Sequence, residues 1–242
     1  MAGVAAERYT VTSVTFRQAA RWISEKFLYL CSVNDRQYLL SLISEGVHQQ
    51  QDFKYKVQDA GKLAHSVSAF ANTNGGRLLI GVRDDGHLSG VRSEEEIYMM
   101  HQAAYKFCQP EASIKFDTFH AEGRTIVVAT VPLSERKPIF AIDEEGHRRA
   151  YIRIADENIL ASPVHLAIWR EESNRRGVLM TYDETDRQLM AALGSQPCMT
   201  LNQLVRRSRI SRQRVITMLA RLVRYGLADW QYDGHGFLFS LK

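Results

Sequence analysis

The sequence predicts an α+β protein with two parts, a larger α/β domain on a mixed sheet and a small domain of three helices and a hairpin. Residues 37–173 alternate between runs with a period of two and amphipathic helical runs, which indicates strands and helices in turn. Residues 182–242 change to short helices with capping residues. We expect residues 1–36 to form a helical extension and residues 174–181 a polar linker.

The composition is that of a folded protein without a membrane partner. The chain has 242 residues, 45% of them hydrophobic, and a net charge of +4, which permits an acidic partner without requiring one. Cys31, Cys108 and Cys198 are far apart, which argues against a disulfide framework and a structural zinc site. No apolar run approaches the ~18 residues of a membrane span, and no signal-peptide core opens the sequence. We therefore expect a cytoplasmic protein.

The α/β domain is expected to hold short strands between amphipathic helices, with all strands in one mixed sheet. A capping box at Ser93 and Glu96 begins one of these helices. In order, we expect a helix at 37–43, a strand at 51–57, a helix at 60–71, a strand at 78–82, the capped helix, strands at 113–119, 125–131, 139–142 and 150–154, and a closing helix at 162–172.

The C-terminal domain has the pattern of a winged helix. Asp183, Thr200 and Ser211 are each placed to cap one of three short helices, and the second and third have helix-turn-helix spacing. Residues 227–241 then predict a hairpin around an Asp-Gly turn, which would be the wing. We therefore expect a winged helix-turn-helix domain at residues 182–242.

The charge of the helix-turn-helix indicates duplex DNA as its partner. Residues 200–226 contain seven arginines and no acidic residue, whereas a merely solvated helix surface normally mixes both signs. We expect Arg212 and Arg214, in the first turn of the third helix, to read base edges. Arg221 and Arg224, two to three turns further on, are expected to contact phosphates. The alternative is a protein-interaction adaptor. The expected DNA-binding residues are Arg206, Arg207, Arg209, Ser211, Arg212, Gln213, Arg214, Thr217, Arg221 and Arg224.

Four segments of the α/β domain resemble a known family. The first is SVSAFANTNGGRLLIGVRDDGHLSGV at residues 66–91, and the others are QDFK, RSEEEIYMM and AYIRIADEN. Together they resemble the Schlafen-type AlbA family, over residues 37–172, and its bacterial members with a C-terminal helix-turn-helix. The resemblance implies a bacterial-type transcriptional regulator, whose AlbA-like domain would serve oligomerisation, including a homodimer, ligand sensing or further nucleic-acid contact.

The glycine pair in the first segment has two interpretations. Gly75 and Gly76 permit a positive φ, so they let the chain turn from helix to strand. The functional alternative is that this turn opens the backbone to a phosphate or a partner chain. The absence of any GxxxxGK[ST] loop argues against nucleotide hydrolysis, and we expect no cofactor.

The family resemblance also implies a nuclease alternative, because some Schlafen proteins cleave RNA with three carboxylates around a divalent metal. The candidates are Glu45 and Asp52, with Asp84 or Asp85 as the third carboxylate and Lys54 as a phosphate contact. Their spacing departs from the family's pattern. Glu45 lies seven positions before Asp52, whereas the family's pattern has five. Arg83 occupies the position directly after the strand where the family commonly has an acid. We therefore expect no catalysis and no metal.

Overall fold

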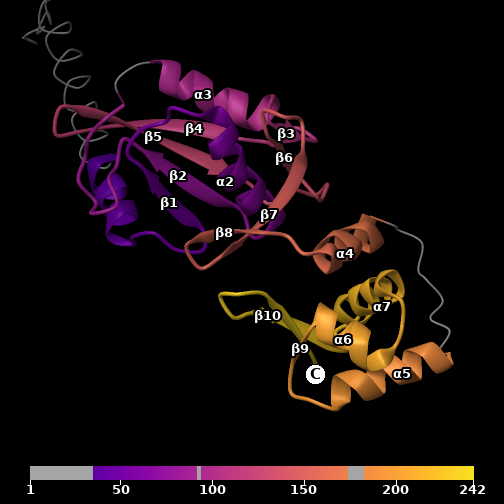
Figure 1. The fold of residues 1–242 in the computed structure, drawn as a ribbon. Coiled ribbons are helices and arrows are strands. Elements are labelled where there is room, and N and C mark those ends of the chain that lie inside the picture. Colours follow the sequence, from indigo (N-terminus) through magenta and orange to yellow (C-terminus); the bar gives the residue numbers. More distant parts are fainter. Residues whose placement is uncertain (1–34, 92–93, 174–182) are drawn as a thin grey trace, which may run out of the picture.

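The computed structural model describes residues 35–91, 94–173 and 183–242. Residues 1–34 of the expected N-terminal extension, Ser93 of the expected capping box and the whole of the expected linker at 174–181 lie outside these residues. Figure 1 shows an α/β part and a C-terminal part, with helix α4 lying between them. None of the described helices is long and apolar enough to span a membrane.

The α/β part follows the expected alternation of strands and helices. A helix at residues 35–44 precedes its first strand. The elements that follow are β1 (Gln51–Lys54), α2 (Ala60–Asn72), β2 (Gly76–Ile80), α3 (Glu94–Tyr105), β3 (Cys108–Gln109), β4 (Lys115–Ala121), β5 (Arg124–Val131), β6 (Phe140–Ile142), β7 (Arg148–Ile154), β8 (Glu157–Leu160) and α4 (Pro163–Ser173).

The strands form two sheets, which corrects the expectation of one. The first is mixed and has the order β1-β2-β5-β4, with β1 and β2 parallel and the other pairs antiparallel. The second, β3-β6-β7-β8, is antiparallel throughout. The strands at 139–142 and 150–154 therefore belong to a sheet of their own, and α2 packs between the sheets (Figure 1).

Helix α2 begins and ends where its sequence dictates. The Asp59 side chain accepts a hydrogen bond of 3.0 Å from the Lys62 backbone N–H at the start of the helix. Gly75 has a φ of +69° and donates its N–H to the Phe70 carbonyl at 2.9 Å, so the helix ends there. Between these ends, Leu63, Val67 and Phe70 are buried in the main core.

The opposite face of the first sheet has a core of its own. Leu39 and Leu42 of the helix at 35–44 are buried against Phe53, Leu79 and Ile126. Apolar side chains therefore cover both faces of β2, which explains why its residues 78–80 are all buried instead of alternating.

The C-terminal part contains the expected three helices and hairpin, with one short additional strand. Asp183 and Thr200 each form a complete capping box, whereas Ser211 occupies the cap position of the third helix without a capping hydrogen bond. The strands form a sheet with the order β10-β11-β9. The elements are α5 (Glu184–Gly194), β9 (Met199–Thr200), α6 (Leu201–Ser208), α7 (Arg212–Arg224), β10 (Ala228–Tyr232) and β11 (Phe237–Leu241).

Helix α4 joins the two parts instead of only closing the first. Val164 and Ile168 are buried in the C-terminal core and α4 packs along α7. Trp169, on the same helix, is buried against Ala150 and Ile152 of β7. The two parts therefore share a packed boundary built around α4.

Candidate nucleic-acid interface

An exposed arginine surface lies where α6 ends and α7 begins. We call Arg206, Arg207, Arg209 and Arg212 the basic surface, and all four are exposed. Arg209 ends α6 with a left-handed φ of +56°, and its N–H donates to the Val205 carbonyl at 3.1 Å. This tight turn places the last turn of α6 next to the first turn of α7, so the arginines gather in one region.

Most of the basic surface has no compensating charge. The ion pairs of the arginines on α6 and α7, within the described residues, involve Arg214, Arg221 and Arg224. Within the described part of the chain, no ion pair involves Arg206, Arg207 or Arg209, so their charges are unpaired. Such charges attract a phosphate backbone, because neutralising phosphates releases condensed counterions.

The first turn of α7 is exposed, but its arginines are partly engaged. Arg212 Nη1 donates to Asn202 Oδ1 at 2.5 Å, and Arg214 Nη2 lies 2.8 Å from Asp183 Oδ2. The backbone N–H of Asp186 is the main cause that lowers the pKa of Asp183, and Arg214 adds to it. Gln213 is exposed between these two arginines.

The C-terminal half of α7 lies against α4, so the predicted DNA-binding face of the helix is not open along its length. Arg221 Nε is 3.8 Å from Glu171 Oε1, and Arg224 Nη1 donates to the Glu171 carbonyl oxygen. Their side chains are 31% and 23% exposed, which leaves little surface for phosphate. Thr217 is half-buried, and its hydroxyl donates to the Gln213 carbonyl at 3.1 Å.

The glycine turn is explained by packing. A Cβ on Gly76 would lie 2.3 Å from the Phe70 ring, and one on Gly75 would lie 3.0 Å from backbone atoms of Val131 and Leu133. The N–H of the first glycine is bonded to the end of α2, and the second pairs with β5. These contacts support the structural interpretation of the pair.

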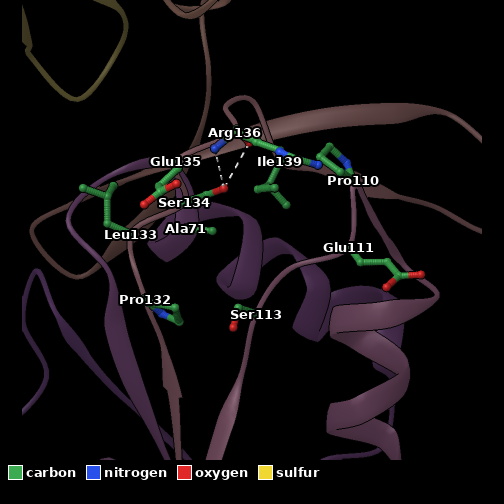
Figure 2. A pocket seen from close by; sticks show the side chains of 10 residues that line it. All are labelled: Ala71, Pro110, Glu111, Ser113, Pro132, Leu133, Ser134, Glu135, Arg136 and Ile139. Atoms are coloured by element: carbon green, nitrogen blue, oxygen red, sulfur yellow. Dashed lines mark hydrogen bonds between the residues drawn. The ribbon is translucent and has the colours of Figure 1, made fainter. Parts of the chain in front are cut away.

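An open pocket of about 640 Å³ lies beside this turn, and Figure 2 shows its side chains. In its rim, Ser134 Oγ donates to the Arg136 carbonyl at 3.0 Å and accepts from the Arg136 N–H at 3.1 Å. These bonds shape the loop after β5. Among the described residues, the acidic side chains that line the pocket are Glu111 and Glu135, which are both exposed.

The carboxylates of the nuclease alternative are engaged separately. Glu45 pairs with Arg77, and Asp52 Oδ2 lies 2.7 Å from Lys54 Nζ and 3.8 Å from Arg153 Nη1. The acids after β2, Asp84 and Asp85, lie in an exposed turn, where Asp85 Oδ1 accepts the His87 N–H at 3.0 Å. The structure therefore gives each of the first two carboxylates a cationic partner from the protein itself.

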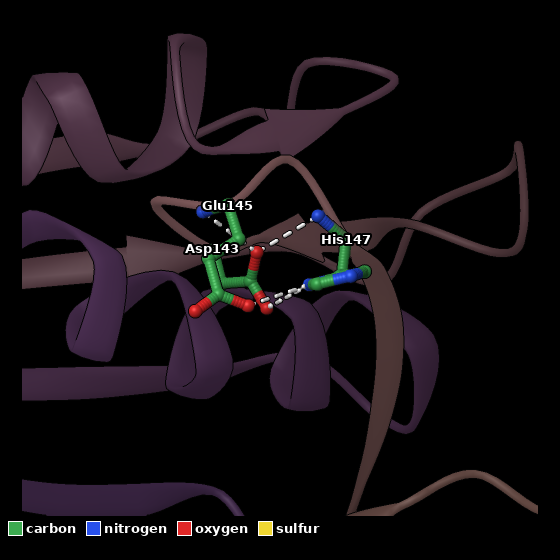
Figure 3. Close-up of side chains that lie close together, drawn as sticks. All are labelled: Asp143, Glu145 and His147. Atoms are coloured by element: carbon green, nitrogen blue, oxygen red, sulfur yellow. Dashed lines mark hydrogen bonds and ion pairs between the residues drawn. The ribbon is translucent and has the colours of Figure 1, made fainter.

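Of the described residues, one group of three potential metal ligands has its ligand atoms within 4.8 Å of one another, and it lies elsewhere. It consists of Asp143, Glu145 and His147 in the turn between β6 and β7 (Figure 3). Asp143 Oδ1 accepts the backbone N–H groups of the other two at 3.1 and 2.8 Å. These hydrogen bonds within the turn explain why the three side chains lie close together. The carboxylates of the nuclease alternative do not form such a group.

The polar residues of the family-like segment have a role that sequence reasoning missed. Asn72 is buried, and its Nδ2 donates to the carbonyls of Ile139 and Tyr151 at 2.9 and 3.0 Å, while its Oδ1 accepts the Ile139 N–H at 2.8 Å. Ser68 Oγ also donates to the Ile139 carbonyl, at 2.8 Å. These side chains attach the second sheet to α2.

Asn72→Ala is expected to lower the free energy of unfolding by about 2 kcal/mol, because it leaves the buried Ile139 N–H without its acceptor. Urea unfolding measures this loss. Asn74→Ala is the matched control, since that asparagine is exposed and belongs to the same segment. Equal stability of both variants would contradict the anchoring role.

Comparisons with known proteins agree with the α/β part. Residues 48–162 match the family model described as Schlafen, AlbA_2. No curated protein sequence matches the chain. The DIP2311 protein from Corynebacterium diphtheriae is a similar solved structure, with 18% identity and a TM-score of 0.43, over 78% of this chain and 34% of that one. This chain thus covers about a third of that protein's length.

A second similar structure is the N-terminal domain of an ATP-dependent DNA helicase RecG-related protein from Nitrosomonas europaea. It has 21% identity and a TM-score of 0.37, over 62% of this chain and 97% of that one. The family match, the two sheets around α2 and the glycine turn describe the same segment. Residues 48–162 are therefore similar to a Schlafen AlbA_2 domain.

Proposed function

We propose that this protein is a DNA-binding transcriptional regulator acting in the cytoplasm, with its C-terminal part as a winged helix. The observation that carries the proposal is the basic surface, a group of exposed arginines that form no ion pair with a carboxylate of the described residues. Helices α6 and α7 supply the helix-turn-helix, and the β10–β11 hairpin is the wing. The α/β domain adds nucleic-acid contact, sensing or a homodimer interface.

The exposed residues suit two different kinds of DNA contact. The phosphate contacts come from the end of α6 and the turn after it, which carry Arg206, Arg207 and Arg209. Their planar guanidinium groups donate hydrogen bonds to phosphate oxygens. Arg212 and Gln213 lie in the first turn of α7, the part of a recognition helix that reaches base edges. Arginine reads guanine and glutamine reads adenine through paired hydrogen bonds.

Arg221 and Arg224 have a different role in this proposal from the one that the sequence suggests. Their contacts with Glu171 hold α4 against the recognition helix. Only the N-terminal part of α7 then enters the groove, and phosphate contacts come from α6. Cleavage has no part in the proposal, because Glu45 and Asp52 are each paired with a cation.

Replacing Arg206, Arg207 and Arg209 together by Gln is expected to weaken binding of the full chain to duplex DNA about 10- to 100-fold at fixed salt. Fluorescence anisotropy with a labelled duplex measures the loss. The control replaces Lys62, Lys106 and Lys115, all exposed in the α/β part, by Gln.

Both triple variants lower the net charge by the same amount, so a general charge effect weakens them equally. A larger loss in the arginine variant supports the basic surface as the DNA site. Equal losses would show that binding depends on overall charge, and unchanged binding in the arginine variant would refute the proposal.

A further inference from the structure

Strand β4 is an open edge of the first sheet. It pairs with β5 over all seven of its residues, and the order β1-β2-β5-β4 leaves its other side without a strand among the described residues (Figure 1). The other edge strands of the described sheets have at most five residues. A long edge strand is a template for pairing with another chain. Of the described strands, β4 is therefore the one most open to an added partner.

The turn at the end of β4 shows which of its backbone groups point away from β5. Residues 122–123 form a two-residue turn with φ of +54° and +70°, so the flanking residues, Ala121 and Arg124, are a hydrogen-bonded pair. Bonded and non-bonded pairs alternate along the ladder, and the carbonyl of Thr125 accepts instead from the Val91 N–H at 2.7 Å. The backbone N–H and C=O groups that face outward are therefore those of residues 116, 118 and 120.

Aromatic side chains lie along this edge on both faces of the sheet. On one face, the ring centroids of Tyr38 and Phe119 are 5.6 Å apart, and the tyrosine is 50% exposed. On the opposite face, the His101 ring of α3 lies 4.5 Å from that of Phe116 and stacks on Tyr105, which is 47% exposed. Tyrosine is enriched at protein interfaces, because it buries a large ring and keeps a polar group. The edge therefore offers aromatic contact area in addition to backbone groups.

The charges of β4 favour a second copy of the same strand as the partner. Lys115 and Asp117 are exposed, and because they are two residues apart, their side chains lie on the same face. If two copies pair antiparallel about Phe116, each lysine lies opposite the aspartate of the other copy, at a non-hydrogen-bonded position where side chains are close. Phe116 then lies opposite itself at the two-fold axis, and such aromatic pairs also stabilise a sheet. The strand is therefore complementary to itself in charge.

We propose that two copies of this chain associate by antiparallel pairing of their β4 strands, in the register that places Lys115 of each copy opposite Asp117 of the other. The pairing joins the two mixed sheets into one continuous sheet and gives the outward backbone groups their partners. Tyr38 and Tyr105, on either face of the edge, contact the second copy. This surface is on the α/β part, whereas the basic surface is on α6 and α7, so the dimer does not require that the protein bind DNA.

The test is sedimentation velocity of the full chain over a range of concentrations. We expect a monomer–dimer equilibrium with a dissociation constant below about 50 µM. Lys115→Glu and Asp117→Lys should each raise this constant at least about tenfold, because each places like charges opposite one another at both symmetric positions. The double variant, which exchanges the two charges, should return the constant to within about threefold of the original. Lys62→Glu, the same charge change on an exposed residue of α2, is the control and should leave it unchanged.

Disulfide formation tests the register independently. A mixture of Lys115→Cys and Asp117→Cys proteins should form a disulfide-linked dimer under mild oxidation, because residues opposite each other at a non-hydrogen-bonded position have Cα atoms about 4.5 Å apart. In either variant alone, the two new cysteines are two positions out of register and too far apart to be bridged. Each should then give no more linked dimer than the unaltered protein, whose three native cysteines set the background.

Three results would overturn the proposal. They are a chain that stays monomeric up to about 200 µM, a dimer that neither charge reversal weakens, and a double variant that does not recover. A monomer would leave β4 open to an extended segment of another protein, and an insensitive dimer would use another surface. Since Lys115→Gln is part of the control for DNA binding, sedimentation of that control separates a loss of the dimer from a loss of the DNA site.

Discussion

Phe70→Ala is expected to lower the free energy of unfolding by about 3–5 kcal/mol, the usual cost of removing a large core side chain. The Phe70 ring is fully buried, and Gly76 lies against it so closely that no Cβ fits between them. The guanidinium carbon of Arg153 also lies over the Phe70 ring, 5.1 Å from the ring centroid. Little of the resulting cavity can therefore close, because backbone and a buried cation form its walls.

Guanidinium chloride unfolding measures this effect. Tyr98→Ala, which removes an aromatic side chain that is 61% exposed on α3, is the control and should cost less than about 1 kcal/mol. A loss below about 1 kcal/mol for the Phe70 variant would show that α2 does not hold the two sheets together.

The free energy of unfolding is expected to fall by about 3 kcal/mol between pH 6.5 and pH 4 because of His165 alone. Burial lowers the pKa of His165 from 6.5 to about 4 in the folded protein. Above pH 6.5 the ring is neutral in both states. As the pH falls below 6.5, the unfolded chain binds a proton that the folded protein does not, so stability decreases until about pH 4.

His165→Gln removes this titration and keeps a polar side chain. The variant should differ from the unaltered protein in the slope of stability against pH within this window. Chemical unfolding at several pH values measures both slopes. Identical slopes would mean that the ring is accessible to water, and would also weaken the case for a closed boundary around α4.

The elements with strong local patterns could be predicted from the sequence. Helix α2 has an apolar face, a capping aspartate and a glycine end, and β2 is an apolar run ended by a turn. The division into two sheets could not be predicted, because it depends on the bonds from Ser68 and Asn72 to residues about 70 positions later. The two-residue strands β3 and β9 carry no periodicity at all.

The candidate site shows the same limit. The sequence indicates that the helix-turn-helix is basic, but it does not show which of its arginines form ion pairs with carboxylates. Glu171 and Asp183 lie outside residues 200–226, and only tertiary packing brings them to Arg224 and Arg214. The basic surface is therefore smaller than the sequence suggests, and it lies on α6 and the turn more than along α7.

The most direct test of the central claim is the salt dependence of binding between the full chain and a random-sequence duplex. If Arg206, Arg207 and Arg209 each neutralise one phosphate, the logarithm of the binding constant should fall linearly with that of the salt concentration, with a slope of about −3. The triple glutamine variant should have a slope near zero. Binding that is absent at 50 mM salt, or whose slope is the same in both proteins, would contradict this account.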